Sequence, residues 1–187
     1  MSQYYSNITI IGLGLIGASI ALSARRGGLV GTITGCDTGA GMAQNKDALA
    51  LVDHFSEDPI MAVADADLVI MAVPVGGEQI IPHMKAGAVL TDTGSTKRSV
   101  LRDVTPHVTD SIHWLPSHPL AGTEHSGPSA GLADLFDGRY WIILPLEVPE
   151  DVVTNFEAFV GGLGAVCERM EPDYHDKVLA LTSHLPH

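Results

Sequence analysis

Three short polar segments carry the residue types that could support catalysis, and each follows an apolar run. They are the glycine-rich residues 12–17, residues 92–97 and residues 118–127. Closely spaced glycines can bring backbone N–H groups to a phosphate, and hydroxyl or ammonium groups can bind a carboxylate or carboxamide. A histidine can transfer protons near neutral pH. These segments therefore indicate proton transfer beside a bound nucleotide.

The glycines of residues 12–17 have the spacing G-x-G-x-x-G, between a predicted strand over residues 8–11 and a predicted helix over residues 15–26. In this motif the first glycine permits a tight turn, the second lets the backbone approach a pyrophosphate, and the third lets the helix pack on the strand. A glycine-rich turn without a ligand is the alternative. The residues expected to bind the diphosphate are Gly12, Gly14, Leu15, Ile16 and Gly17.

An acidic residue at the end of the second predicted strand strengthens the nucleotide interpretation. Asp37 lies 20 residues after Gly17 and directly follows the apolar run 32–36. A carboxylate at this position accepts hydrogen bonds from both ribose hydroxyls of NAD and repels the 2′-phosphate of NADP. The expected cofactor is therefore NAD, and a solvated acid at a strand end is the alternative.

Two further strand ends are expected to border the nicotinamide half of the cofactor, because ligands of open α/β sheets bind outside the carboxyl ends of the strands. Val73 and Pro74 follow the first of these runs, although a proline that only terminates a buried strand would give the same pattern. Asp92 and Gly94 follow the second run. All four residues are expected to lie near the cofactor.

Acid–base chemistry is expected from the segments at residues 92–97 and 118–127. A hydroxyl such as that of Ser95 could bind a substrate group, or could only cap the helix that begins near Lys97. The later segment holds two histidines, a glutamate and hydroxyls, and is expected to be a loop that presents an acid–base group to substrate. His118 is the candidate base.

A metal site is not expected. His118, Glu124 and His125, or His184 and His187, contain metal-binding atoms. The sequence nevertheless has neither an H-E-x-x-H motif nor a Cys/His spacing typical of zinc.

The elements that must position these segments alternate between short apolar runs and amphipathic stretches. This alternation is typical of a parallel sheet covered by helices, so the predicted fold class is α/β, with a doubly wound, mostly parallel sheet of Rossmann type. Strands are predicted at residues 8–11, 32–36, 68–73, 88–92, 112–115, 140–144 and 165–169. Helices are predicted at residues 15–26, 40–49, 59–64, 78–84, 99–107, 129–135 and 152–159.

Residues 1–170 are expected to form one nucleotide-binding domain. Pro172 suits the first turn of a further helix, and leucines at positions 179, 181 and 185 give that helix an apolar face. The sequence stops at His187 without a cap or stop signal. Residues 171–187 are therefore expected to begin a helical domain whose remainder is missing.

Composition restricts the class of protein. With 22 acidic and 10 basic residues, the 187-residue chain has a formal net charge of −12, which argues against nucleic acid as a partner. Hydrophobic residues make up 45% of the chain, as in a globular protein with a filled core. Two cysteines suit a reducing compartment, and no apolar run is long enough for a membrane span. A cytoplasmic protein is expected.

The order of the motifs resembles that of the prephenate and arogenate (cyclohexadienyl) dehydrogenase family of tyrosine biosynthesis. The segment H-P-L-A-G-T-E, which begins at His118, is far more specific for this family than the glycine-rich turn. The segments that carry the resemblance are residues 12–17, 72–74, 92–97, 118–127, 134–138 and 183–187.

The resemblance implies an NAD-dependent oxidative decarboxylation, which converts prephenate to 4-hydroxyphenylpyruvate or arogenate to tyrosine. It implies that His118 accepts the proton of the ring hydroxyl and that Ser95 hydrogen-bonds the same hydroxyl or the histidine. Thr123 and Glu124 are implied to bind or order the substrate. His187 is implied to approach the substrate from the far wall of the site.

Family members continue past the last motif into a helical domain that dimerises and supplies an arginine for a substrate carboxylate. A homodimer is therefore expected only for a full-length version, and this chain is expected to bind NAD with little turnover. Two alternatives stay open. One is a β-hydroxyacid-type dehydrogenase, which relies on a lysine in a following helical domain, and the other is a non-catalytic NAD-binding module.

Overall fold

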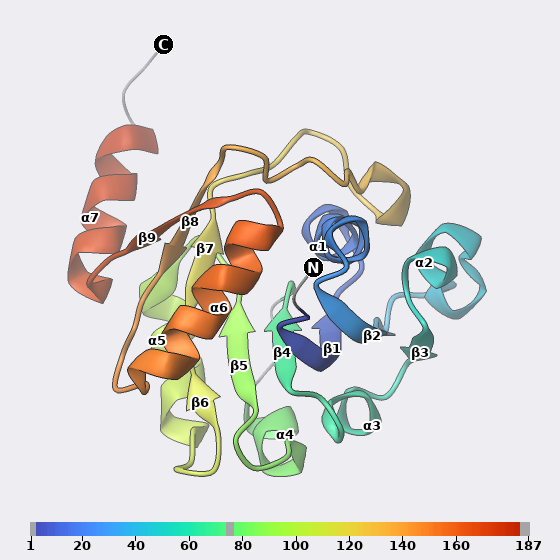
Figure 1. Cartoon of the computed structure of the whole chain (residues 1–187), viewed down its shortest axis with the longest axis horizontal. Helices are drawn as coiled ribbons and strands as arrows, with labels where there is room; N and C mark the ends of the chain where they lie inside the picture. Colours follow the sequence, from blue (N-terminus) through green and yellow to red (C-terminus); the bar gives the residue numbers. More distant parts are fainter. Residues whose placement is uncertain (1–2, 74–76, 184–187) are drawn as a thin grey trace.

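The computed structural model describes residues 3–73 and 77–183 (Figure 1). A six-stranded parallel sheet has the order β3-β2-β1-β4-β5-β6, and a three-stranded sheet has the order β7-β8-β9. The strands are β1 (Tyr5–Ile11), β2 (Val30–Cys36), β3 (His54–Ser56), β4 (Leu68–Met71), β5 (Val89–Asp92), β6 (His113–Trp114), β7 (Ser117–Pro119), β8 (Tyr140–Ile143) and β9 (Val166–Arg169). The helices are α1 (Leu15–Gly27), α2 (Lys46–Leu51), α3 (Pro59–Val63), α4 (Gly77–Ile80), α5 (Lys97–Val104), α6 (Glu150–Gly162) and α7 (Pro172–Ser183).

The six-stranded sheet is buried on both faces, which confirms the predicted doubly wound α/β fold. Every residue of β4 is buried, and successive side chains of a strand point to opposite faces. Leu68 and Ile70 belong to one apolar core with residues of α1, α2 and α6. Val69 and Met71 belong to a second core with residues of α3, α4 and α5. The strand order reverses at β1 and β4, where sheets of this type bind ligands.

Two short strands differ from the sequence prediction. β3 was not predicted, and its three residues pair with β2 in a parallel register. The prediction of a loop over residues 118–127 is wrong at its start, because His118 pairs with Ile142 in an antiparallel register between β7 and β8. Strands of three residues are too short for a periodic pattern, so their partners in the sheet determine them.

The predicted helices at residues 78–84 and 99–107 end in the 3₁₀ turns Ile81–His83 and Thr105–His107, and two other predicted helices differ more. Residues 40–49 contain a 3₁₀ turn, Met42–Gln44, and only then α2, because Asn45 caps α2 by accepting the backbone N–H groups of Asp47 and Ala48. The helix predicted at residues 129–135 is wrong. The chain forms a 3₁₀ turn at Pro128–Ala130 and then further turns.

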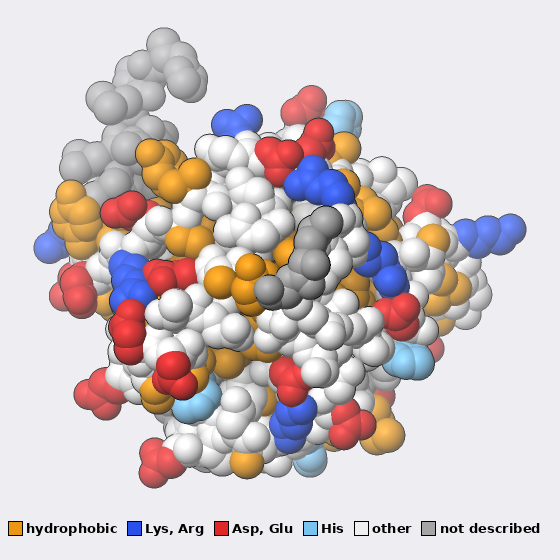
Figure 2. All heavy atoms as spheres, viewed as in Figure 1, with side chains coloured by type: hydrophobic (Ala, Val, Ile, Leu, Met, Phe, Trp, Pro, Cys, Tyr) orange, Lys and Arg blue, Asp and Glu red, His pale blue; other side chains and the backbone are white. Residues whose placement is uncertain are grey.

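The C-terminal helix α7 begins at Pro172, where the sequence predicts a first helical turn, and contacts α5. Figure 1 shows it at the end of the molecule, beyond the smaller sheet. The division of the chain at residue 170 stays a prediction. Figure 2 shows acidic and basic side chains interspersed on the viewed face. Within residues 3–73 and 77–183, no helix is long and apolar enough to cross a bilayer.

Candidate active site

The glycine-rich turn joins β1 to α1 and has the geometry that its spacing predicts. Gly12 has a φ of 94°, and a Cβ atom there would lie 2.4 Å from Cγ1 of Val73. A Cβ atom on Gly17 would lie 1.9 Å from the carbonyl oxygen of Gly12. A Cβ atom on Gly14 would meet no described atom within 4 Å outside its chain neighbours. The outer glycines therefore permit close packing, whereas Gly14 leaves space for a ligand to approach the backbone.

The N-terminus of α1 offers backbone donors at this turn. Gly14 is the N-cap residue, and among the described residues no side chain caps the helix. Ala18 donates the first intrahelical hydrogen bond, to the carbonyl of Gly14 at 2.9 Å. The N–H groups of Leu15, Ile16 and Gly17 therefore have no acceptor within the helix. These groups and the positive end of the helix dipole can bind the diphosphate of a nucleotide.

Asp37 lies beside the turn, as the sequence predicts. Its Oδ2 accepts the N–H of Leu13 at 2.9 Å, and its Oδ1 accepts the N–H of Gly39 at 2.8 Å. This placement follows from the parallel register of β1 and β2, in which Ile11 pairs with Cys36. The remaining lone pairs of the carboxylate can accept the hydroxyl groups of a ribose.

A cavity of about 480 Å³ lies at the carboxyl ends of β4 and β5. Its volume lies within the range of small-molecule sites, and residues from α5 form one of its walls. Pro74, which the sequence also placed here, lies outside the described residues. The predicted site residues that line the cavity are Ile16, Val73, Asp92, Gly94 and Ser95.

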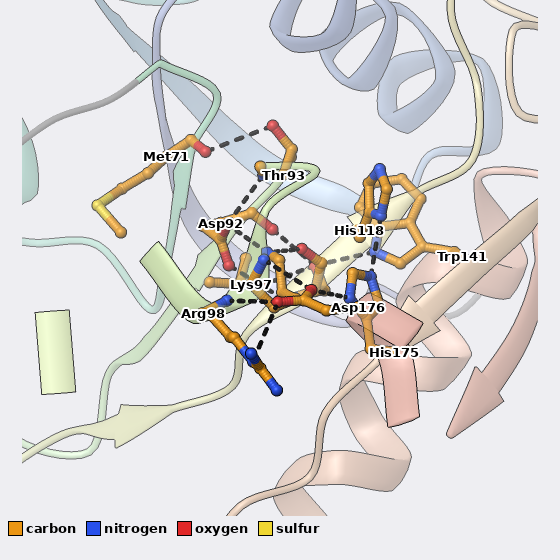
Figure 3. Close-up of polar contacts among 12 residues, drawn as sticks. Met71, Asp92, Thr93, Lys97, Arg98, His118, Trp141, His175 and Asp176 are labelled. Atoms are coloured by element: carbon orange, nitrogen blue, oxygen red, sulfur yellow. Dashed lines mark hydrogen bonds and ion pairs between the residues drawn. The ribbon is translucent and has the colours of Figure 1, made fainter. Parts of the chain in front are cut away.

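Asp92 also forms a buried ion pair with Lys97 (Figure 3). Nζ of Lys97 donates to Oδ2 of Asp92 and to the carbonyl oxygen of Ser117, and neither charged side chain is more than 4% exposed. Asp92 also accepts the N–H of Gly94 at 2.8 Å and the N–H of Ser117 at 3.2 Å. Burial raises the pKa of Asp92 and lowers the pKa of Lys97 despite their attraction. Both carboxylate oxygens are engaged within the protein, and they hold the end of β5 against the start of β7.

The candidate base, His118, hydrogen-bonds a second histidine that comes from α7 (Figure 3). Nδ1 of His118 lies 3.1 Å from Nε2 of His175, and Nδ1 of His175 lies 2.8 Å from Oδ1 of Asp176. His175 is completely buried. Asp176 also accepts the N–H groups of Lys97 and Arg98 at 3.3 and 3.2 Å. The first turns of α7 thus contact both the candidate base and the start of α5.

The surroundings of His118 favour its uncharged form. Burial lowers its pKa from the usual 6.5 to about 4, and the positive charge of Lys97 adds to this effect. At neutral pH the imidazole can therefore accept a proton. Burial alone would raise the pKa of Asp176, but hydrogen bonds from His175 and from the N–H groups of α5 lower it overall. Asp176 is thus a carboxylate.

The other predicted site residues are not gathered around the candidate base. Ser95 is exposed and lines the cavity. Thr123 accepts the N–H of His125 at 3.2 Å, and the side chain of Glu124 is 86% exposed. His187 lies outside the described residues. The roles of these four residues stay predictions. Within the described parts of the chain, no cluster of three or more His, Cys, Asp or Glu residues could hold a metal.

Sequence reasoning missed the burial of Lys97 and the contribution of His175 and Asp176. Lys97 belongs to the polar segment 92–97, but its pairing with Asp92 depends on the fold. An adjacent histidine and aspartate at the start of a helix is a weak signal. Nothing in the local pattern relates His175 to His118, which lies 57 positions earlier.

Known proteins similar to this chain match it over nearly its whole length. Residues 20–169 match the sequence model of the family described as "Prephenate dehydrogenase, nucleotide-binding domain". The cyclohexadienyl dehydrogenase of Zymomonas mobilis is 38% identical over 189 residues, which cover 98% of this chain and 64% of that protein. The prephenate dehydrogenase of Bacillus subtilis is 31% identical over 196 residues, which cover 100% of this chain and 52% of that protein.

A solved structure has the same fold. The prephenate dehydrogenase of Aquifex aeolicus in complex with hydroxyphenyl propionate and NAD+ superposes with a TM-score of 0.85 at 30% identity, over 97% of this chain and 65% of that one. The chain therefore spans between about half and two thirds of the length of these relatives. Because the family match covers well over half of the chain, this protein belongs to the family of prephenate dehydrogenase nucleotide-binding domains.

Proposed function

We propose that this chain binds NAD and supplies the base for the oxidative decarboxylation of prephenate or arogenate. The observation that carries the proposal is the uncharged, partly buried His118, which β7 holds in a fold that also forms a nucleotide-binding turn. Membership of the prephenate dehydrogenase family supports this substrate class over the 3-hydroxy acids of a β-hydroxyacid dehydrogenase.

The residues of the turn fit NAD. Gly14 leaves open space at the N-terminus of α1, where backbone N–H groups can bind the diphosphate. The carboxylate of Asp37 suits two ribose hydroxyls and would repel a 2′-phosphate, which favours NAD over NADP. When bound, NAD supplies a nicotinamide ring that accepts a hydride. The relative from A. aeolicus binds NAD+.

In the proposed reaction, His118 accepts the proton of the ring hydroxyl as a hydride leaves the same carbon. The ring carboxylate then leaves as CO2, and the electron pair of the broken C–C bond completes the aromatic ring. Ser95 hydrogen-bonds the hydroxyl, and Thr123, Glu124 and His187 contact the substrate. Because aromatisation drives the reaction, the main task of the protein is to orient the substrate beside the cofactor.

We propose that the complete activity also requires residues that correspond to the uncovered part of the relatives. We place the binding of the substrate carboxylates and the formation of a homodimer in the region of the relatives that this chain does not cover. The 187 residues accordingly bind NAD with little turnover of their own. A cytoplasmic location is part of the proposal and agrees with the two free cysteines, Cys36 and Cys167.

Cofactor binding is tested by calorimetry with NAD and NADP on the chain and on Gly14→Ala. The added methyl group meets no described atom, so the free energy of unfolding should stay within about 0.5 kcal/mol. It occupies the space where the diphosphate approaches, so the affinity for NAD should fall about tenfold or more. Gly161→Ala, on the exposed side of α6, is the matched control. Unchanged affinity in Gly14→Ala, or tighter binding of NADP than of NAD, contradicts the proposed site.

Turnover is tested by joining the chain to the uncovered C-terminal part of the Z. mobilis relative and following NADH formation with prephenate or arogenate. His118→Asn should lower kcat by a factor of about 10² to 10⁴, as for the loss of a general base. His54→Asn, an exposed histidine on β3, should not. Full activity of His118→Asn rejects the base assignment. Activity only on 3-hydroxy acids supports the β-hydroxyacid alternative, and NAD binding without turnover supports a non-catalytic module.

A further inference from the structure

Three side chains from β7 and α7 form a hydrogen-bonded series (Figure 3). Oδ1 of Asp176 lies 2.8 Å from Nδ1 of His175, and Nε2 of His175 lies 3.1 Å from Nδ1 of His118. The two imidazole rings meet edge to face, with centroids 5.3 Å apart. His175 is completely buried, yet the proposed reaction assigns it no task. A buried titratable ring beside the candidate base requires a chemical explanation.

The carboxylate at one end of the series determines the direction of both hydrogen bonds. An ionised carboxylate can only accept, so neutral His175 carries its proton on Nδ1 and has a lone pair on Nε2. That lone pair must accept a hydrogen bond, so His118 carries its proton on Nδ1. We propose that Asp176 and His175 are positioning residues that hold His118 in the tautomer whose Nε2 can take the substrate proton.

The same series can receive the charge that the proposed reaction creates. When Nε2 of His118 takes the hydroxyl proton, the proton on its Nδ1 can pass to Nε2 of His175. His118 is then neutral again, with its proton on Nε2, and His175 is an imidazolium ion that donates to Asp176. One proton enters the series and one positive charge results, so the step balances.

Neighbouring charges favour this displacement. The groups that face His118 are Lys97 from α5 and His175 and Asp176 from α7, and Lys97 is itself paired with Asp92. The charge of Lys97 disfavours a cation on His118, whereas a cation on His175 directly contacts a carboxylate. The N–H groups of Lys97 and Arg98 hold that carboxylate in place.

The tautomer can be measured on the 187-residue chain without substrate, by long-range ¹H–¹⁵N NMR of the imidazole nitrogens. At neutral pH we expect Nδ1 of both His118 and His175 to carry a proton and Nε2 of His118 to carry none. A proton on Nε2 of His118, or a mixture of both tautomers, would overturn the proposal.

Asp176→Asn tests whether the carboxylate determines the direction of the two hydrogen bonds. An asparagine amide can either accept or donate, so the direction is no longer imposed and His118 should lose its single tautomer. Asp173→Asn is the matched control, because Asp173 is on the same helix, is 89% exposed and lies 4.0 Å from Arg98, at the limit of an ion pair. An unchanged single tautomer in Asp176→Asn overturns the proposal. If that variant does not fold, the measurement on the unaltered chain still decides.

The assignment of Asp176 and His175 as positioning residues rests on the proposed function in one respect: the proton that His118 takes comes from the ring hydroxyl of the substrate. In the joined enzyme, His175→Gln keeps an acceptor for His118 but cannot become a cation, so kcat should fall about tenfold or more while the KM for NAD stays unchanged. Unchanged kcat would overturn the proton transfer to His175. The expected tautomer without any turnover would reject the proposed function alone, and the wrong tautomer with full turnover would reject only the role of the series.

Discussion

At the scale of the residue, burial keeps His118 uncharged and a structural ion pair adds to that effect. Lys97 is buried because Asp92 and the carbonyl oxygen of Ser117 accept its hydrogen bonds, and an isolated buried ammonium would be far too costly. The pair holds β5 against β7, and its cation also lowers the pKa of His118. A contact that joins two strands therefore also adds to the effect of burial in keeping the candidate base uncharged.

This predicts a pH dependence of stability. The pKa of His118 is about 4 in the folded protein and near its usual 6.5 in the unfolded chain. Between these values the unfolded chain binds a proton that the folded protein does not, so the free energy of unfolding falls as the pH drops from 6.5 to 4. Urea unfolding across this range should give a smaller decrease for His118→Asn than for the unaltered chain. His54→Asn should keep the original slope, and equal slopes for all three proteins would contradict the assignment.

At the scale of the element, prediction from sequence succeeded where a segment determines its own structure. The run of β4 and the glycine-rich turn are local signals, and both have the predicted form. β3 and β7 escaped prediction because three residues acquire strand geometry only by pairing with β2 and β8. His175 escaped for a related reason, since only the packing of α7 brings it to β7.

The contact between α7 and α5 gives a prediction about helix capping. Thr96 is the N-cap residue of α5 but forms no capping side-chain bond, and the carboxylate of Asp176 accepts the first N–H groups instead. Asp176→Ala should therefore lower the free energy of unfolding by about 0.5–2 kcal/mol through the lost cap, and by about 1–3 kcal/mol more because buried His175 loses its acceptor. Hydrogen exchange at the amides of Lys97 and Arg98 should become faster. Asp173→Ala should change neither quantity, and unchanged exchange in Asp176→Ala would show that another group caps α5.

At the scale of the whole molecule, the two sheets share one apolar core. Trp141 and Ile143 of β8 pack in the same cluster as Ile8 and Ile10 of β1 and residues of α6. Polar contacts add to this packing, since Oγ of Ser117 on β7 donates to the carbonyl oxygen of Asp92 on β5 at 2.8 Å and accepts the indole N–H of Trp141 at 2.9 Å. Many buried side chains of the shared core hold the two sheets together, whereas Asp92 and Lys97 contribute a single ion pair. We therefore expect the sheets to unfold together even without that pair.

The two tryptophans of the chain can test this expectation, because Trp114 lies on β6 of the larger sheet and Trp141 on β8 of the smaller one. Lys97→Met leaves a buried carboxylate without its cation and should lower the free energy of unfolding by about 3–5 kcal/mol. Adding Asp92→Asn to the same chain should restore part of this loss. Trp114→Phe leaves Trp141 as the reporter of the smaller sheet, and Trp141→Phe leaves Trp114 as the reporter of the larger one. During unfolding in urea, the fluorescence of each variant should change together with the far-UV circular dichroism, both in the unaltered background and in Lys97→Met. A Trp141 signal that changes before the circular dichroism in Lys97→Met would instead show that the ion pair holds the smaller sheet in place. The candidate base would then depend on one buried charge for its position, because β7 carries it, and that charge also contributes to its low pKa.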